Sequence, residues 1–166
     1  MFRSGKSLLT SAGGLCQSNA KKMKLFEFEA KNILREYDIA IPRGNLATNP
    51  DEAELTVREI GRPAVLKSQI LVAGRGKSGG IIYVNDAAEA KNMASNLIGS
   101  TIKANVVRSL LIEEKLDIVE QFYASVAIDR QARTYIALAS TSGGIDIEEV
   151  ALASPDKISR HWVDPI

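Results

Sequence analysis

Apolar residues recur at helical spacing in several parts of the chain, which predicts amphipathic helices. The first runs from Leu25 to Tyr37, where charged residues lie between apolar ones. Helix start and stop signals predict a second helix over 50–60, which stops at Gly61, and a third over 87–97, which ends near Gly99. The expected N-caps are Thr48 or Asn49 for the second helix and Asp86 for the third.

Short apolar runs between these helices predict β-strands, because strands need only a few residues and are bounded by turn formers. The polar stretch 129–133 is expected to join two of them as a hairpin, and alternating apolar and acidic residues predict a half-exposed strand at 145–150. A short helix is expected at 154–156. The expected strands before 145 are 45–47, 63–69, 81–85, 106–113, 121–129 and 134–140.

This order of elements indicates an α/β (α+β) fold in which an α/β part is followed by a β-rich part. The second part offers few elements to cover the faces of an antiparallel pair. We therefore interpret the sequence as a fragment of a larger fold.

Composition and charge exclude several classes of function. The chain has 166 residues, of which 45% are hydrophobic and 25% charged, as in ordinary globular proteins. A formal net charge of +1 gives no reason to expect a nucleic acid partner. Cys16 is the single cysteine, so an internal disulfide is excluded, and no apolar run is long enough to cross a bilayer.

The first 22 residues differ from the rest, because they carry four basic residues and no acidic one. They resemble a transit peptide, but they also fit an upstream start codon, since Met23 directly precedes the folded-looking sequence. With either origin, we expect residues 1–22 to be disordered and outside the fold.

A glycine-rich stretch with basic residues follows the strand that ends near Lys67. Gly74-Arg75-Gly76-Lys77-Ser78-Gly79-Gly80 combines flexible backbone with two cations. Backbone N–H groups in such turns bind anions, and cations beside them favour phosphate. The alternative is a mobile hairpin turn. The stretch lies between two expected strands, so it is neither a Walker A loop nor a dinucleotide-binding fingerprint.

Four motifs in a fixed order carry a family resemblance over residues 23–166. Together they resemble the amino-terminal ATP-grasp region of the β subunit of succinate–CoA ligase (succinyl-CoA synthetase). Malate–CoA ligase and the front portion of ATP-citrate lyase share the motifs and remain alternatives. The motifs are Lys24-Leu25-Phe26-Glu27-Phe28-Glu29-Ala30-Lys31, Val65-Leu66-Lys67-Ser68-Gln69, the stretch 74–80, and Gly143-Gly144-Ile145-Asp146-Ile147-Glu148-Glu149-Val150-Ala151.

The resemblance implies a ligase of the tricarboxylic acid cycle. Such enzymes form succinyl-CoA from succinate, CoA and ATP or GTP with Mg²⁺, through a phosphohistidine on an α subunit that also carries the CoA site. It further implies an ATP-grasp fold that is incomplete at its C-terminus. Residues 23–42 with 117–166 are then a partial lobe, and 43–116 an inserted α/β subdomain that carries the glycine-rich loop.

The same resemblance assigns nucleotide-binding residues. Lys67 resembles the lysine that contacts the phosphates, and Gly74, Arg75 and Gly76 resemble the phosphate loop. Glu113 and Leu116 match positions at the adenine edge. The family often has a ribose-binding glutamate where this chain has Gln121, so Gln121, or Glu120 if the alignment slips by one, is expected to contact the ribose.

Other features are interpreted as structural or lie outside the chain. Metal ligands and catalytic residues are expected beyond Ile166, so we expect this chain alone not to catalyse the formation of succinyl-CoA. The alternative function is a truncated, non-catalytic interaction module. His161 and the acidic residues Asp146, Glu148 and Glu149 are interpreted as structural. The compact stretch from Gly76 to Gly79 favours a prokaryotic cytoplasmic protein, whereas the basic tail favours the mitochondrial matrix. Neither the acid used nor a preference for ATP over GTP follows from these residues.

Overall fold

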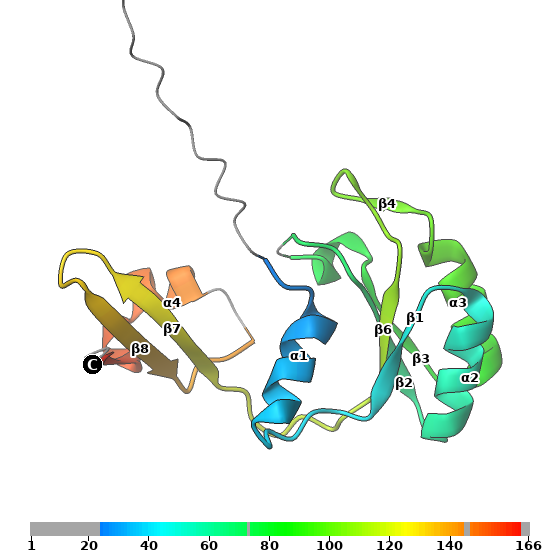
Figure 1. Cartoon of the computed structure of the whole chain (residues 1–166), viewed down its shortest axis with the longest axis horizontal. Coiled ribbons are helices and arrows are strands. Elements are labelled where there is room, and N and C mark those ends of the chain that lie inside the picture. Colours follow the sequence, from blue (N-terminus) through cyan, green and yellow to red (C-terminus); the bar gives the residue numbers. More distant parts are fainter. Residues whose placement is uncertain (1–23, 73, 145–146, 164–166) are drawn as a thin grey trace, which may run out of the picture. The chain divides into compact units, whose positions relative to one another are not determined.

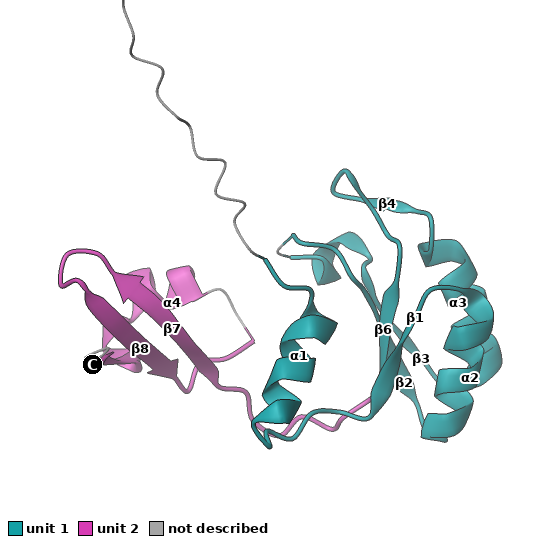
Figure 2. Ribbon diagram, viewed as in Figure 1, with its two compact units in different colours: residues 1–114 teal, residues 115–166 magenta. Residues whose placement is uncertain are grey.

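The computed structural model describes residues 24–72, 74–144 and 147–163. The expectations for residues 1–22, including Cys16, therefore lie outside the described residues. The chain divides into two compact units, residues 1–114 and 115–166 (Figure 2). The grouping of 23–42 with 117–166 stays a prediction, while helix α1 (Glu27–Glu36) packs within the first unit.

The first unit is built on an antiparallel four-stranded sheet with the order β1-β6-β2-β3. Helix α1 lies on one face of this sheet, and α2 and α3 lie on the other (Figure 1). The elements are β1 (Gly44–Ala47), α2 (Pro50–Ile60), β2 (Ala64–Ser68), β3 (Ile81–Val84), α3 (Ala87–Leu97) and β6 (Leu110–Glu114).

Alternation along β2 and β6 sends Leu66, Leu110 and Ile112 to the core beneath α2 and α3, while Lys67 and Glu113 share the opposite face with the apolar Val65 and Leu111. Leu66 and Ile112 are opposite each other in the register and are fully buried in the core beneath the two helices. Lys67 and Glu113 point to the face that α1 covers, since neighbouring residues of a strand alternate in direction. The hydrophobic core therefore holds in place the strands that present these charges.

The predicted helices and their caps in this unit are confirmed. The Asn49 side chain accepts a hydrogen bond from the Glu52 backbone N–H at 2.9 Å, so Asn49 rather than Thr48 is the cap of α2. Asp86 caps α3 in the same way, with a bond of 2.8 Å from the Glu89 backbone N–H. Helix α2 ends at Gly61, which has a φ of 68° that glycine adopts at little cost.

One strand of this unit is shorter than predicted. The apolar run 106–113 was expected to be continuous, but β6 begins at Leu110. Residues 105–106 form β5 (Asn105–Val106), which pairs instead with β4 (Thr101–Ile102). Lys103 and Ala104, both with positive φ, turn the chain between these strands. A continuous apolar run does not show that its first residues, in β5, pair with a different strand from its last residues, in β6.

The second unit contains a three-stranded antiparallel sheet of order β7-β8-β9, not only the predicted hairpin. The hairpin of β7 (Tyr123–Asp129) and β8 (Thr134–Ser140) is confirmed. The third strand, β9 (Ile158–Val163), was not predicted, and it places His161 opposite Ala137. A 3-10 helix (Pro155–Lys157) precedes it.

The strand predicted at 145–150 is wrong. Residues from Ile147 onward form helix α4 (Ile147–Ala153), while 145–146 lie outside the described residues. Glu148 and Glu149 occupy the first turn, where the helix dipole favours negative charge. Val150 is the buried residue of this helix. The acidic and apolar residues from Ile147 onward thus follow a helical pattern.

Glu114 provides a test of the first unit by acid titration. Its carboxylate accepts a bond of 3.0 Å from the Arg43 backbone N–H and lies 3.4 Å from Arg62, and the Arg43 bond is the main cause that lowers its pKa below the ordinary 4.5. Stability from such a group is present above the unfolded pKa and is lost as pH falls below 4.5 through the folded pKa. We therefore expect Glu114→Gln to destabilise the chain at neutral pH.

This difference between Glu114→Gln and wild type should shrink as the pH falls below 4.5, because the wild-type carboxylate then becomes protonated. Urea unfolding at neutral pH and at acid pH measures it. A difference that is the same at both pH values would contradict the assignment.

Candidate functional site

The face of the sheet under α1 carries a compact group of charged side chains. Lys67 on β2 and Glu113 on β6 stand on neighbouring strands, and the Lys67 Nζ lies 2.6 Å from Glu113 Oε2. Glu113 is almost fully buried, with 2% of its side chain exposed. A carboxylate so buried requires paired cations, and Lys67 supplies one of them.

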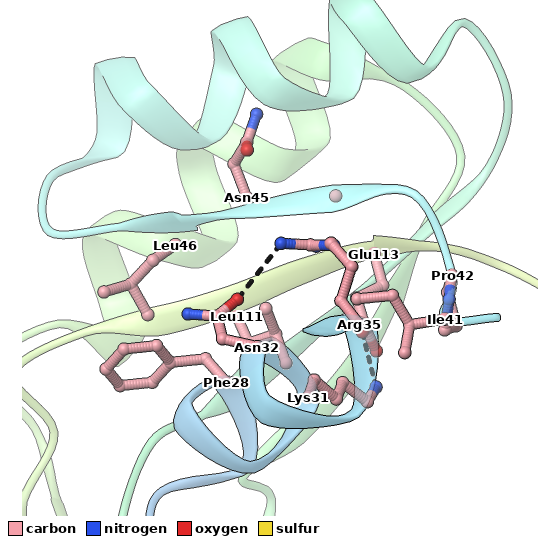
Figure 3. Close-up of a pocket in the computed structure, with 11 residues that line it drawn as sticks. Phe28, Lys31, Asn32, Arg35, Ile41, Pro42, Asn45, Leu46, Leu111 and Glu113 are labelled. Carbon is pink, nitrogen blue, oxygen red and sulfur yellow. Dashed lines mark hydrogen bonds and ion pairs between the residues drawn. The ribbon is translucent and has the colours of Figure 1, made fainter. Parts of the chain in front are cut away.

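Helix α1 adds a second carboxylate and a second lysine to this group. Glu27 and Lys31 are one helical turn apart, and the Lys31 Nζ lies 3.0 Å from Glu27 Oε1. Lys31 also forms an ion pair with Glu113 (Figure 3), while Lys67 lies 3.1 Å from the same Glu27 oxygen. The helix is therefore tied to the sheet by charges on both elements.

Arg75 reaches the same group from the glycine-rich loop. Its guanidinium forms an ion pair with Glu27 Oε2 and donates a hydrogen bond of 3.1 Å to the Ser68 carbonyl. The loop turns back on itself because the Gly80 N–H donates to the Arg75 carbonyl at 2.8 Å. Gly74, with a φ of 66°, starts the turn in a conformation that favours glycine. The predicted loop is thus a short turn whose arginine points at the charged face.

Glu27, Lys31, Lys67, Arg75 and Glu113 form what we call the ion cluster. It contains three cations and two carboxylates, so at neutral pH it carries a net charge of +1. Burial lowers the pKa of Lys31, an effect that the bond to Glu113 opposes and the charge of Lys67 reinforces. Burial also lowers the pKa of Arg75. An additional anion at this cluster would therefore relieve uncompensated positive charge.

A pocket of about 190 Å³ adjoins the ion cluster and shares Lys31 and Glu113 with it (Figure 3). Its wall combines aromatic, aliphatic and polar side chains, and along α1 Arg35 donates a bond of 3.2 Å to Asn32. The other lining residues are Phe28, Ile41, Pro42, Gly44, Asn45, Leu46 and Leu111. Such a mixed pocket next to a cationic group suits an organic anion with an uncharged end.

The structure brings together some of the residues singled out in the sequence. Lys67, Arg75 and Glu113 belong to the ion cluster, and Gly74 and Gly76 flank Arg75 in the loop. The carboxylate of Glu113 faces two lysines, so its predicted contact with a base edge would have to come from its backbone. The nucleotide contacts of all five residues stay predictions.

Leu116 and Gln121 belong to the second unit, and their predicted roles also stay predictions. Leu116 is 47% exposed. The backbone carbonyl of Gln121 accepts a hydrogen bond of 3.1 Å from the Gly143 N–H. A Cβ atom on Gly144 would lie 1.9 Å from the Gln121 side-chain oxygen, so the Gly143-Gly144 motif makes room for this glutamine.

Glu27 and Lys31 were not assigned a role by sequence reasoning, although they lie in the first family motif. Their separation of four residues indicates a shared helix face. It does not indicate that this face lies on a sheet, because partners such as Glu113 are 82 residues away from Lys31 in sequence. Their place in the cluster became apparent only from the folded chain.

Among residues 24–72, 74–144 and 147–163, no three His, Cys, Asp or Glu side chains gather as a metal site would require. In the same described part of the chain, no helix has the length and apolar character needed to span a membrane.

The class of this protein follows from its fold together with comparisons with known proteins. Residues 24–166 match the ATP-grasp domain family, so the chain belongs to that family. Its fold resembles the ATP-citrate lyase of Methanothrix soehngenii, with a TM-score of 0.64 and 24% identity over 86% of this chain and 35% of that one. The fold also resembles an acetyl-coenzyme A synthetase of Candidatus Korarchaeum cryptofilum, with a TM-score of 0.61 and 22% identity. This match covers 82% of this chain and 59% of that one.

Sequence relatives narrow the class to one kind of subunit. The chain is 46% identical to the β subunit of the ADP-forming succinate–CoA ligase of Pyrobaculum islandicum, over 86% of this chain and 37% of that subunit. It is 39% identical to the corresponding subunit of Deinococcus radiodurans, over 87% of this chain and 38% of that subunit. The resemblance to the ATP-grasp region of this subunit is therefore confirmed, and the chain spans less than two fifths of these relatives.

Proposed function

We propose that this chain is the nucleotide-binding part of the β subunit of a succinate–CoA ligase. The observation that carries the proposal is the ion cluster, which is positive overall and adjoins a pocket of mixed polarity. The two sequence relatives described above, both named as that subunit, support it. The complete enzyme would form succinyl-CoA from succinate, CoA and a nucleoside triphosphate.

In this proposal the base of the nucleotide occupies the pocket and its phosphates lie against Lys67 and Arg75. Both cations are about four fifths buried, so they act on a phosphate where water screens little. Backbone N–H groups around Gly74 and Gly76 add hydrogen bonds that glycine makes sterically accessible. These residues bind and orient the triphosphate, whereas the transfer itself requires groups elsewhere.

Several further components belong to the same proposal. Mg²⁺ would neutralise charge on the phosphates when bound, with ligands outside this chain. An α subunit would supply the phosphohistidine and the CoA site, as the family resemblance implies. The ADP-forming relatives favour ATP over GTP, and their prokaryotic sources favour the cytoplasm over the mitochondrial matrix.

Calorimetry with ATP and with adenosine tests the proposal on the full chain in the presence of Mg²⁺. We expect ATP to bind and its affinity to fall as salt rises, because the phosphates contact charged side chains. Adenosine, which lacks the phosphates, should bind much more weakly. The absence of ATP binding, or equal affinity for both compounds, would instead favour the non-catalytic interaction module.

A further inference from the structure

Glu27 holds a special position in the ion cluster, because it alone of the two cluster carboxylates pairs with all three cations. Its Oε1 atom lies 3.0 Å from Lys31 Nζ and 3.1 Å from Lys67 Nζ. Its Oε2 atom is the ion-pair partner of Arg75. One carboxylate thus bridges the lysine of β2 and the arginine of the loop, as two oxygens of a phosphate group would.

The two cluster carboxylates differ in how accessible they are. Glu113 is 2% exposed and is held by Lys67 of β2 and Lys31 of α1, as a permanent structural charge would be. Glu27 is 23% exposed and, together with Arg75, lines a second hollow of about 400 Å³. The remaining residues of that hollow are Lys24, Leu25, Ile70, Leu71 and Val72. An anion in this hollow would lie beside the Glu27–Arg75 pair.

We propose that Glu27 is an internal counterion that pairs with Arg75 and Lys67 in the place of a phosphate and gives up both cations when a polyphosphate binds. This inference rests on the proposed nucleotide function and concerns the regulation of the same site. Glu27 holds the loop arginine against the sheet, since each buried cation needs a partner. A polyphosphate carries more negative charge than one carboxylate and therefore displaces it.

This role makes Glu27 a competitor of the ligand. Replacing Glu27 with glutamine keeps the size of the side chain but removes its charge, which raises the net charge of the cluster from +1 to +2. We expect Glu27→Gln to bind tripolyphosphate and ATP about fivefold more tightly, the strength of a partly exposed ion pair. The fall in affinity with rising salt should also be steeper than in wild type, because the ligand then faces one more positive charge that no carboxylate of the cluster neutralises.

Calorimetry of wild type, Glu27→Gln and the control Glu36→Gln at two salt concentrations makes the test. Glu36 lies at the end of the same helix, outside the ion cluster, so its replacement should leave the affinity close to that of wild type. If wild type binds neither ATP nor tripolyphosphate, the proposed function fails. If wild type binds both but Glu27→Gln binds equally or more weakly, Glu27 is a positioning residue and the counterion inference is overturned.

A second measurement on wild type covers the case in which Glu27→Gln does not fold. The ¹⁵N resonances of the Arg75 guanidinium should shift when tripolyphosphate is added, because its carboxylate partner is exchanged for phosphate oxygens. The corresponding resonances of Arg58, which pairs with Glu54 on α2, serve as the internal reference and should stay unchanged. Unchanged Arg75 resonances under saturating tripolyphosphate would overturn the inference.

Discussion

Replacing Lys67 with methionine is expected to weaken ATP binding by roughly 10-fold to 100-fold. A charge-assisted hydrogen bond contributes about 1.5–3 kcal/mol, and each 1.4 kcal/mol is about a factor of ten in the dissociation constant. Lys67 is 21% exposed, so solvent screens its charge only in part. The substitution also lowers the net charge of the ion cluster from +1 to zero, which removes the attraction for an anion.

Calorimetry of wild type and Lys67→Met with Mg²⁺ and ATP measures this effect, and Lys91→Met is the matched control. Lys91 lies on α3 on the opposite face of the sheet, where it pairs with Asp51 at 2.6 Å and Glu54 at 3.0 Å. Its loss should leave ATP affinity within about twofold of wild type. Equal affinities for Lys67→Met and Lys91→Met, with both proteins folded by circular dichroism, would remove Lys67 from the site.

Replacing Gly44 with alanine is expected to destabilise the chain by about 3 kcal/mol. A Cβ atom at this position would lie 1.9 Å from the Ile112 carbonyl oxygen and 2.8 Å from the Glu113 Cα, which are backbone atoms of β6. Backbone in a paired strand cannot move aside as a flexible side chain does. Strand β1 would therefore separate from β6 at this point, and overpacking of this kind typically costs 1–3 kcal/mol or more.

Urea unfolding of Gly44→Ala measures this loss, and Gly61→Ala is the control. A Cβ atom on Gly61 meets nothing within 4 Å, but its φ of 68° is unfavourable for alanine. We expect Gly61→Ala to cost about 1 kcal/mol, the penalty of a left-handed conformation alone. A loss for Gly44→Ala no larger than that for Gly61→Ala would mean that β1 and β6 do not approach each other so closely.

Much of the fold could be predicted because local signals and packing agree in the first unit. Helices α2 and α3 have side-chain caps, and their apolar faces match the helical period, so pattern and structure coincide. Prediction failed for α4 and β9, where the local pattern fits more than one element or is weak. The segment that became α4 has acidic and apolar residues that fit a strand or a first helical turn equally well, and strand β9 begins directly after a 3-10 helix without an apolar run of its own.

The candidate site was predicted only in part, for a different physical reason. Lys67 and Arg75 could be named because each lies in a motif with a recognisable composition. Glu27 and Lys31 lie on a helix whose sequence is an ordinary amphipathic one, and nothing local marks their charges as functional. Their significance depends on which partner lies opposite them across the sheet.

The amino-acid sequence by itself determined helices α2 and α3, the hairpin of β7 and β8, and the family to which this chain belongs. These are properties of neighbouring residues or of ordered motifs, so they do not depend on distant contacts. Only the tertiary structure decided that α1 covers the sheet face of Lys67 and Glu113 and that Glu27, Lys31, Lys67, Arg75 and Glu113 share one set of charges. Their coming together depends on strand order and helix docking, because β2 and β6 are neighbours only in the folded sheet and α1 brings Glu27 and Lys31 to them from another part of the chain.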